Sequence, residues 1–238
     1  THINMIDAII LAAGQGTRMK SNKAKVLHQI GGKSLLQHVI DAINPLSTSI
    51  NIVISNDAEL VKNSINTHSI NWVVQKKQLG TGHAVKQAIP YVKDQSMYLI
   101  IYGDVPLIKT STLKTLTSKA KETGFSLLSV IQAEPTGYGR IIRNSNRVIK
   151  SIVEHKDASD KEQEIREINT GIMAIKGSLL KKYISQLKPN NKQGELYLTD
   201  IVENAVTDNV TISSLVCDNV SEVMGINNKN QLAEAERI

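Results

Sequence analysis

The fold is decided by the stretch MIDAIILAAGQGTRM, residues 5–19, near the start of the chain. Its first part, Met5–Leu11, is an apolar run interrupted only by Asp7, which is typical of a strand buried on both faces of a parallel sheet. A turn rich in small residues follows, and glycines in such turns let backbone N–H groups approach phosphates. Because parallel α/β sheets bind ligands at the carboxyl ends of their strands, the stretch predicts an anion site directly after the first strand.

Residue spacing excludes two common phosphate-binding loops at this turn. A P-loop needs Lys and then Ser or Thr directly after its last glycine, and no such pair follows Gly16. A dinucleotide-binding fingerprint needs a third glycine or alanine at the place of Met19. Four cations do follow within eight residues that contain no acid, and they suit a small polyanion such as a triphosphate. These cations are Arg18, Lys20, Lys23 and Lys25.

The next 120 residues alternate between strand-like and helix-like patterns. Strands are expected at 50–54, 70–74, 97–102 and 125–132, the third being the most apolar. Helices are expected at 34–43, 57–65, 82–89 and 110–122, with Ser34 as an N-cap. Such alternation predicts an α/β fold with right-handed crossovers and a mostly parallel sheet flanked by helices.

The pattern changes after about residue 135. A hairpin is expected from strands at 139–143 and 147–153, which flank Asn144-Ser145-Asn146. Further strands are expected at 168–175 and 210–216, and helices at 178–187, 199–206 and near the end of the chain. The second half therefore predicts a small mixed-sheet, β-rich lobe built onto the first.

Composition excludes several classes of protein. The net charge is +6, but most cations are scattered and aromatic residues make up 3%, which leaves little for stacking on nucleic-acid bases. The single cysteine, Cys217, excludes an internal disulfide and is compatible with a reducing cytosol. The sequence contains no run of 18 apolar residues, so it predicts no membrane-spanning helix. Residues 1–10 do not resemble a signal peptide. We expect a cytoplasmic protein that binds neither nucleic acid nor membranes.

A candidate metal ligand follows the most apolar strand, in Tyr102-Gly103-Asp104-Val105-Pro106. Mg²⁺ prefers one or two carboxylates together with substrate oxygens and water. An Asp-x-Pro turn is the alternative interpretation of Asp104. Its position beside the glycine-rich turn favours the metal.

Further polar groups occur where strands end. Gln75 carries the donor and acceptor that the edge of a uracil or thymine requires, while Thr81 is either a ligand or a helix cap. Asn227 is likewise either a ligand or a cap. Polar groups that suit sugar hydroxyls lie in the segments 137–140, 153–155 and 168–171.

These motifs together resemble a known family. In chain order they are LAAGxGTRM, KVLH, QLGTGHA, YGDVPL, PTGYGR, IVEHKDA and EINTGI, between residues 11 and 172. The chain resembles the N-terminal uridylyltransferase domain of bacterial bifunctional N-acetylglucosamine-1-phosphate uridyltransferase/glucosamine-1-phosphate acetyltransferases. The resemblance implies a Rossmann-like nucleotidyltransferase fold and a cytoplasmic enzyme that uses Mg²⁺. It implies uridylyl transfer from UTP to N-acetylglucosamine 1-phosphate, which gives UDP-N-acetylglucosamine for peptidoglycan and lipopolysaccharide synthesis.

The resemblance also implies the role of each matched residue. Catalysis would involve Arg18, Lys25 and Asp104. The nucleotide would contact Leu11, Ala12, Ala13, Gly14, Lys25, Gln75, Gly80 and Thr81. The sugar would contact Tyr102, Gly103, Asp104, Gly139, Glu154, Asn169 and Asn227, and the metal would be held by Asp104 and Asn227.

Two residues depart from the family pattern. Gln15 stands where the family usually has Lys, and Ala24 stands where it usually has Pro, so the affinity for a triphosphate is the property in doubt. The resemblance further implies that residues 1–227 form the transferase domain and that 228–238 begin a helix leading to a left-handed β-helix acetyltransferase domain. The fragment would then be a monomer and the full-length enzyme a homotrimer. The alternatives are a relative with another sugar phosphate or nucleotide, a silent nucleotide-sugar sensor and a basic nucleic-acid-binding protein.

Overall fold

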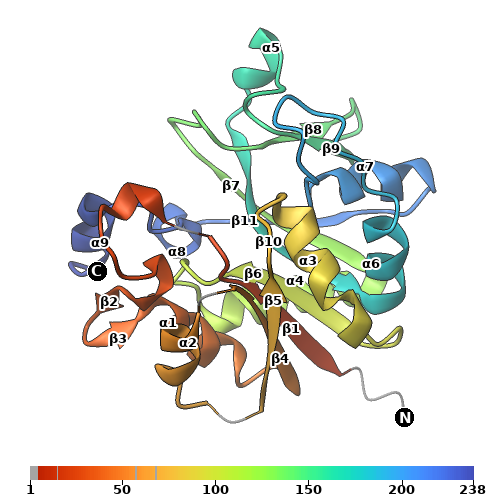
Figure 1. Ribbon diagram of the computed structural model, residues 1–238. Helices are drawn as coiled ribbons and strands as arrows, with labels where there is room; N and C mark the ends of the chain where they lie inside the picture. Colours follow the sequence, from red (N-terminus) through yellow and green to blue (C-terminus); the bar gives the residue numbers. More distant parts are fainter. Residues whose placement is uncertain (1–4, 15, 57, 68) are drawn as a thin grey trace.

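The apolar strand β6 (Met97–Tyr102) lies at the centre of the main sheet, where both of its faces are covered. The computed structural model describes residues 5–14, 16–56, 58–67 and 69–238 (Figure 1). Within them one mixed sheet has the order β11-β7-β10-β6-β1-β4-β5, with β8 and β9 attached beside β10. The other strands of this sheet are β1 (Ile6–Leu11), β4 (Ser49–Ser55), β5 (Ile70–Gln75), β7 (Phe125–Ile131), β8 (Arg140–Arg143), β9 (Ile149–Val153), β10 (Glu167–Lys176) and β11 (Ser213–Cys217).

The sheet is mostly parallel, as the alternating pattern predicts. β1 pairs in parallel with β4 and β6, β4 with β5, and β11 with β7. β10 runs antiparallel between β6 and β7. The α/β fold class and the mixed sheet are therefore confirmed.

The extent of the second lobe differs from the expectation. β10 and β11 belong to the main sheet, and only the β8–β9 hairpin and the short helix α5 (Asp160–Gln163) project from it (Figure 1). The reason lies in the run Ile172–Ile175, whose four side chains are all fully buried. A strand that is apolar on both faces is most stable inside a sheet, between two covered neighbours.

Helices cover both faces of the sheet and divide the core into two main layers. The helices α1, α2 and α4 pack on one face, and α3, α6 and α7 pack on the other (Figure 1). Their bounds are α1 (Leu35–Ile43), α2 (Glu59–Asn63), α3 (Thr81–Ala88), α4 (Thr110–Thr123), α6 (Gly177–Ile184) and α7 (Asp200–Thr207). The chain also forms α8 (Val220–Val223) and α9 (Lys229–Ala235).

The helix boundaries show where local patterns were sufficient. Ser34 caps α1 as predicted, since its hydroxyl accepts a hydrogen bond of 3.1 Å from the Gln37 N–H. Thr81 is not a cap, because Gly80 occupies that position and the Thr81 hydroxyl accepts from the Leu198 N–H instead, at 3.0 Å. The expected start of α2 at Asp57 lies outside the described residues.

Several short elements were not anticipated from the sequence. A two-stranded ribbon of β2 (Gln29–Ile30) and β3 (Lys33–Ser34) precedes α1. Short 3-10 turns are η1 (Thr17–Met19), η2 (Lys25–Leu27) and η3 (Ile89–Tyr91). No helix in the described part of the chain is long and apolar enough to cross a membrane.

A partly buried ion pair ties the projecting hairpin to the sheet. Arg143 on β8 donates from Nε and Nη2 to the two carboxylate oxygens of Glu167 on β10, at 2.8 and 2.6 Å. The Ser129 hydroxyl on β7 donates to the same carboxylate at 2.8 Å. Burial by itself would raise the pKa of Glu167, but the hydrogen bonds from Arg143 and Ser129 outweigh it and lower the pKa below 4.5.

We predict that Glu167→Gln destabilises the fold in a pH-dependent way. Glu167 has a depressed pKa in the folded state, so its stabilisation is present above pH 4.5 and is lost as the pH falls through the folded-state pKa. At pH 7 the variant should lose about 1–3 kcal/mol of unfolding free energy, a value discounted for partial exposure of the pair. Urea unfolding of both proteins at pH 7 and in acid measures the difference.

The control is Asp41→Asn, which breaks the exposed pair with Lys33. An exposed pair contributes about 0–1 kcal/mol, so this variant should remain close to the wild type. A Glu167→Gln variant whose deficit did not shrink in acid would contradict the assigned role of the ion pair.

Candidate functional site

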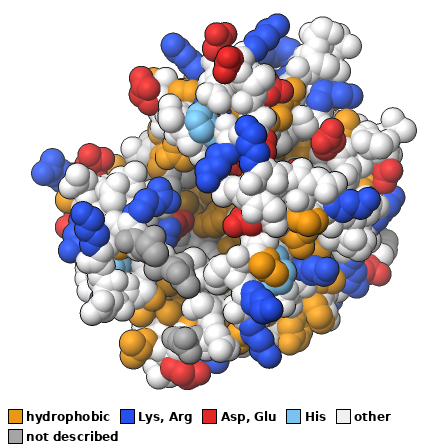
Figure 2. Space-filling model, turned by 45° about the horizontal axis from the view of Figure 1, so that its top comes forward, with side chains coloured by type: hydrophobic (Ala, Val, Ile, Leu, Met, Phe, Trp, Pro, Cys, Tyr) orange, Lys and Arg blue, Asp and Glu red, His pale blue; other side chains and the backbone are white. Residues whose placement is uncertain are grey.

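A cleft of about 400 Å³ opens at the carboxyl ends of β1, β5 and β6. Figure 2 shows a hollow on this face of the molecule, with Lys and Arg side chains at its rim. All eight residues assigned to a nucleotide by resemblance line the cleft, together with Asp104 and Asn227. The eight are Leu11, Ala12, Ala13, Gly14, Lys25, Gln75, Gly80 and Thr81.

A second cavity of about 280 Å³ adjoins the cleft and reaches under the β8–β9 hairpin. It shares Thr81, Tyr102 and Glu195 with the cleft. Four of the residues assigned to a sugar line it, namely Tyr102, Gly139, Glu154 and Asn169. The cleft and this cavity therefore form one continuous space with two compartments.

Gly103 is the assigned sugar contact that lines neither compartment. Its N–H donates to the Leu11 carbonyl at 3.0 Å, which ties the end of β6 to the end of β1. A β-carbon at Gly103 would lie 3.1–3.3 Å from Val26, Ala12 and Leu36 side chains, so the residue is packed from beneath. Gly103 therefore lies beneath the surface of the site, against residues that line it or pack behind it.

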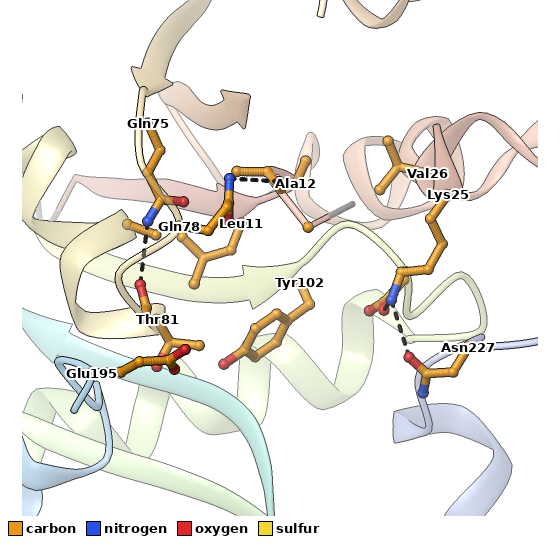
Figure 3. Close-up of a pocket in the computed structure, with 15 residues that line it drawn as sticks. Leu11, Ala12, Lys25, Val26, Gln75, Gln78, Thr81, Tyr102, Glu195 and Asn227 are labelled. Carbon is orange, nitrogen blue, oxygen red and sulfur yellow. Dashed lines mark hydrogen bonds and ion pairs between the residues drawn. The ribbon is translucent and has the colours of Figure 1, made fainter. Parts of the chain in front are cut away.

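Three segments distant in sequence converge on the ammonium group of Lys25, on η2. The ammonium pairs with the carboxylate of Asp104, directly after β6, and donates to Asn227 Oδ1 at 3.1 Å (Figure 3). Arg18, on η1, also approaches Asn227 Oδ1, at 3.4 Å. The Lys25 and Asp104 side chains are 15% and 14% exposed, so this pair at the wall of the cleft is mostly covered.

The cluster has donor atoms that fit a hard divalent cation. A carboxylate and an amide oxygen, the ligand types that Mg²⁺ prefers, both face one positively charged group. No cluster of three or more His, Cys, Asp or Glu suited to a metal occurs among the described residues, so a cation here would need substrate oxygens or water to complete its shell.

The structure shows that Asn227 is not the helix cap, an alternative that the sequence left open. Asn228 is the N-cap of α9, because its side chain accepts from the Gln231 N–H at 2.9 Å. Asn227 is the residue that faces Lys25 and Arg18. The second departure from the family pattern, Ala24, is an exposed residue that directly precedes η2, and Gln15 lies outside the described residues.

Gln75, at the end of β5, is nearly fully buried, at 2% exposure. Its Nε2 lies 3.3 Å from the Gly80 carbonyl and 3.0 Å from His83 Nδ1 (Figure 3). The donor half of the amide is thus used within the protein. The expectation that Gln75 offers both donor and acceptor to a base needs this correction, since only Oε1 remains for a ligand.

The second cavity is acidic. Burial raises the pKa of Glu154, a hydrogen bond of 3.0 Å from the Thr199 hydroxyl opposes the rise, and the charge of Asp157 adds to it. Burial, with the charges of Glu203, Glu154 and Asp157, raises the pKa of neighbouring Asp200 to about 6. Carboxylate and amide acceptors of this kind suit hydroxyl groups as hydrogen-bond donors.

Five polar lining residues were not indicated by the sequence: Gln78, Gln193, Glu195, Tyr197 and Thr199. Gln78 donates to the Ala13 carbonyl at 3.0 Å and so joins the loop after β5 to the glycine-rich turn. The other four lie on the segment 193–199, which is irregular up to Thr199, the residue before α7. Its backbone is held by the Leu196 N–H to the Leu79 carbonyl, at 2.9 Å, and by the Gly82 N–H to the Leu196 carbonyl, at 2.8 Å.

Gly80 makes this close approach possible. Its φ is +109°, which L-residues with side chains rarely adopt, and a β-carbon there would lie 2.5 Å from the Leu196 carbonyl oxygen. The glycines on both sides of Thr81 therefore bring the segment 193–199 against the cleft. Cys217 is remote from this chemistry, and burial raises the pKa of its thiol.

Comparisons with curated proteins confirm the resemblance inferred from the motifs. The chain is 54% identical over 236 residues to "Bifunctional protein GlmU" of Vesicomyosocius okutanii subsp. Calyptogena okutanii (strain HA), covering 99% of this chain and 52% of that protein. It is 52% identical over 233 residues to the protein of the same name from Ruthia magnifica subsp. Calyptogena magnifica, covering 98% and 51%. The chain thus spans about half the length of the curated relatives it matches.

Solved structures share the fold. A UDP-glucose pyrophosphorylase complexed with UDP-glucose superimposes with a TM-score of 0.78 at 18% identity, covering 98% of this chain and 97% of that chain. HddC from Yersinia pseudotuberculosis, complexed with GMP-PN, superimposes with a TM-score of 0.69 at 21% identity, covering 98% and 99%. At such identities the likeness concerns the fold alone.

The model of the MobA-like NTP transferase domain family matches residues 8–167, which include most of β1, the glycine-rich turn, Asp104 and six of the thirteen residues that line the second cavity. This match covers more than half of the chain, and the chain therefore belongs to the MobA-like NTP transferase family, as a nucleotidyltransferase domain.

Proposed function

We propose that this domain transfers a uridylyl group from UTP to N-acetylglucosamine 1-phosphate, giving UDP-N-acetylglucosamine and pyrophosphate. The observation that carries the proposal is the two-compartment space, because a nucleotide sugar also has two parts joined by phosphates. The nucleotide would occupy the cleft and the sugar the acidic cavity, with Thr81 and Tyr102 at their junction. The phosphates would then lie on the side of Lys25.

The reaction needs positioning and charge neutralisation more than proton transfer. A phosphate oxygen of the sugar phosphate attacks the α-phosphorus in line, an O–P bond forms, and the bond to pyrophosphate breaks. The attacking oxygen is already anionic, so no general base and no covalent enzyme intermediate are required. Lys25 and Arg18 would stabilise charge on the phosphate oxygens, Lys25 as a point charge and Arg18 through its planar fork of donors.

Mg²⁺ is the cofactor that we propose, with Asp104 and Asn227 as its protein ligands. When bound, it would add positive charge beside the non-bridging phosphate oxygens. The chain's own residues would do the rest: the backbone of residues 11–14 would hold the nucleotide, and Gly80 and Gln75 would border the base. Gly139, Glu154 and Asn169 would orient the sugar.

The domain division is also a proposal, and it is supported by the length of the relatives, of which this chain covers about half. We propose that residues 1–227 form the transferase unit and that 228–238 begin the connection to a second domain. The connecting segment contains α9, which packs through Leu232 and Ala235 on Ile30, Leu35 and Ile226 of the transferase unit. Acetyl transfer and trimer formation would belong to that second domain, and residues 1–238 alone would be monomeric.

A pyrophosphate-release assay tests the proposed function directly. The purified domain would be supplied with Mg²⁺, one of UTP, CTP or dTTP, and one of several sugar 1-phosphates. Turnover should be fastest with UTP and N-acetylglucosamine 1-phosphate. A higher specificity constant for another pair would replace these substrates by that pair, and the absence of turnover with every pair would refute the proposal.

We predict that Asp104→Asn lowers turnover by about 10²-fold or more, the scale of losing one key electrostatic group. The substitution removes the proposed metal carboxylate and also the partner that holds the Lys25 ammonium in place. The measurement is kcat at saturating Mg²⁺ and both substrates. Asp94→Asn, which breaks an exposed pair with Lys181, is the control and should retain wild-type turnover. Near-normal kcat for Asp104→Asn would remove Asp104 from the mechanism.

The glycine-rich turn also fixes the position of Lys25. Gly16 has a φ of +59°, and a β-carbon added there would lie 2.5 Å from Lys25 Cβ. Gly31 has nearly the same φ, +57°, but a β-carbon there would meet nothing within 4 Å. An alanine at either position would therefore suffer the same backbone strain. Only the alanine at position 16 would also collide with a proposed catalytic residue.

We predict that Gly16→Ala and Gly31→Ala each cost about 1–2 kcal/mol of stability, the cost of a left-handed residue with a side chain. Only Gly16→Ala should also lower kcat strongly, by about 10²-fold, because it displaces the Lys25 ammonium by a fraction of an ångström or more. Thermal unfolding and turnover would be measured on both variants. Equal kcat values would mean that Gly16 serves the backbone alone.

A further inference from the structure

Gln75 is held in one orientation by two neighbours, the Gly80 carbonyl and the His83 ring. A carbonyl oxygen can only accept, so the Gly80 carbonyl fixes the Gln75 amide nitrogen on its own side, at 3.3 Å. His83, the third residue of α3, accepts the other N–H of the amide at its Nδ1 atom, at 3.0 Å. Figure 3 shows the amide nitrogen pointing toward the carbonyl beside Thr81 and the amide oxygen pointing away from it.

The imidazole can hold the amide in this way only when Nδ1 is its acceptor. A neutral imidazole accepts at one nitrogen and donates at the other. Gln87 Nε2 also approaches the other ring nitrogen, His83 Nε2, at 3.3 Å, and it donates to the His83 carbonyl at 3.1 Å. The shorter ring contact is the one to Gln75, and we assign the acceptor to Nδ1 on that ground.

The charge state of His83 supports this assignment. Burial, aided by the positive charge of Lys86, lowers the pKa of His83 below 6.5. The ring is therefore neutral at pH 7 and retains one acceptor nitrogen. A protonated ring would donate at both nitrogens and would turn the amide oxygen of Gln75 toward itself.

With both N–H groups engaged, Gln75 presents a single type of atom to the cleft. Oε1 accepts no hydrogen bond from the described residues and is the part of the amide left for a ligand. Uracil carries an N–H donor at position 3, which matches this oxygen. Cytosine carries an unprotonated acceptor nitrogen at the same position, and two facing acceptors in a buried site are unfavourable.

We propose that His83 is a positioning residue for base selection: it fixes the Gln75 amide with Oε1 toward the base, so that the cleft takes uracil and rejects cytosine. This inference rests on the proposed function, in which the cleft holds the pyrimidine nucleotide. It predicts that selectivity, more than turnover, depends on His83, because the residue acts through Gln75 and contacts no proposed phosphate or sugar group.

The test is a direct-binding comparison of UTP and CTP, by calorimetry without any sugar phosphate, on wild type and His83→Leu. Leucine has a similar size and removes the acceptor at 3.0 Å. The longer contact to the Gly80 carbonyl, at 3.3 Å, is then the remaining one, so Gln75 rotates more readily and offers its N–H groups to cytosine. The ratio of Kd values, CTP over UTP, should fall by about tenfold, the effect of losing one fixed neutral hydrogen bond. In the uridylyl-transfer assay, KM for the sugar phosphate should be unchanged.

Two further variants separate positioning from a structural role. His83→Asn carries an oxygen close to the place of Nδ1 and should restore the wild-type ratio. Gln87→Leu removes the neighbour on the Nε2 side only and should leave the ratio unchanged. If His83→Leu weakened both nucleotides equally, or if His83→Asn failed to restore the ratio, His83 would not be the positioning residue.

The outcome also distinguishes this inference from the proposed function. A wild-type domain that selects UTP in binding but does not turn over UTP with N-acetylglucosamine 1-phosphate would refute the proposed function and leave the base-selection test valid. A wild-type domain that turns over this pair but binds CTP as tightly as UTP would refute the inference alone.

Discussion

The ion pair between Lys25 and Asp104 is the interaction on which the geometry of the site depends. Both side chains are mostly covered, and a covered ion pair is stable only when further polar partners compensate for lost hydration. Asn227 supplies such a partner from a segment 202 residues away from Lys25. One ammonium group therefore locates three parts of the chain: the η2 turn, the end of β6 and the loop before α9. A triphosphate would compete with Asp104 for the same ammonium, which couples phosphate binding to the availability of the carboxylate.

The second constraint is the contact between backbones at Gly80 and Leu196. Without a side chain at Gly80, the segment 193–199 can lie against the start of α3, where it is held by paired backbone hydrogen bonds. This contact carries Glu195 to the junction of the compartments and places Thr199 within hydrogen-bond reach of Glu154. The shape of the acidic cavity therefore depends on a glycine in the neighbouring cleft. A side chain at Gly80 would displace the segment 193–199 and so alter both compartments.

Local sequence patterns were sufficient where the determining contacts are local. The apolar run of β6, the cap at Ser34 and the glycine-rich turn all follow from residues within a few positions of one another. The pairing of β10 between β6 and β7 could not be deduced in this way, because it depends on partners about 40 and 75 positions away. The same holds for Glu195 and Tyr197: their segment is irregular, and only the Leu196 backbone contacts bring it to the site.

The case of Gln75 shows why the identity of a lining residue does not by itself define its chemical role. From the sequence, its amide offers one donor group and one acceptor group, and either could serve a base. Burial changes this, since a buried amide must satisfy its hydrogens, and here the protein's own acceptors at Gly80 and His83 do so. What a ligand meets is the part of the amide that the protein has not used. Under the proposed function, base recognition at this cleft would be set by the neighbours of Gln75 as much as by Gln75 itself. Those neighbours lie at the start of α3, against which the segment 193–199 packs.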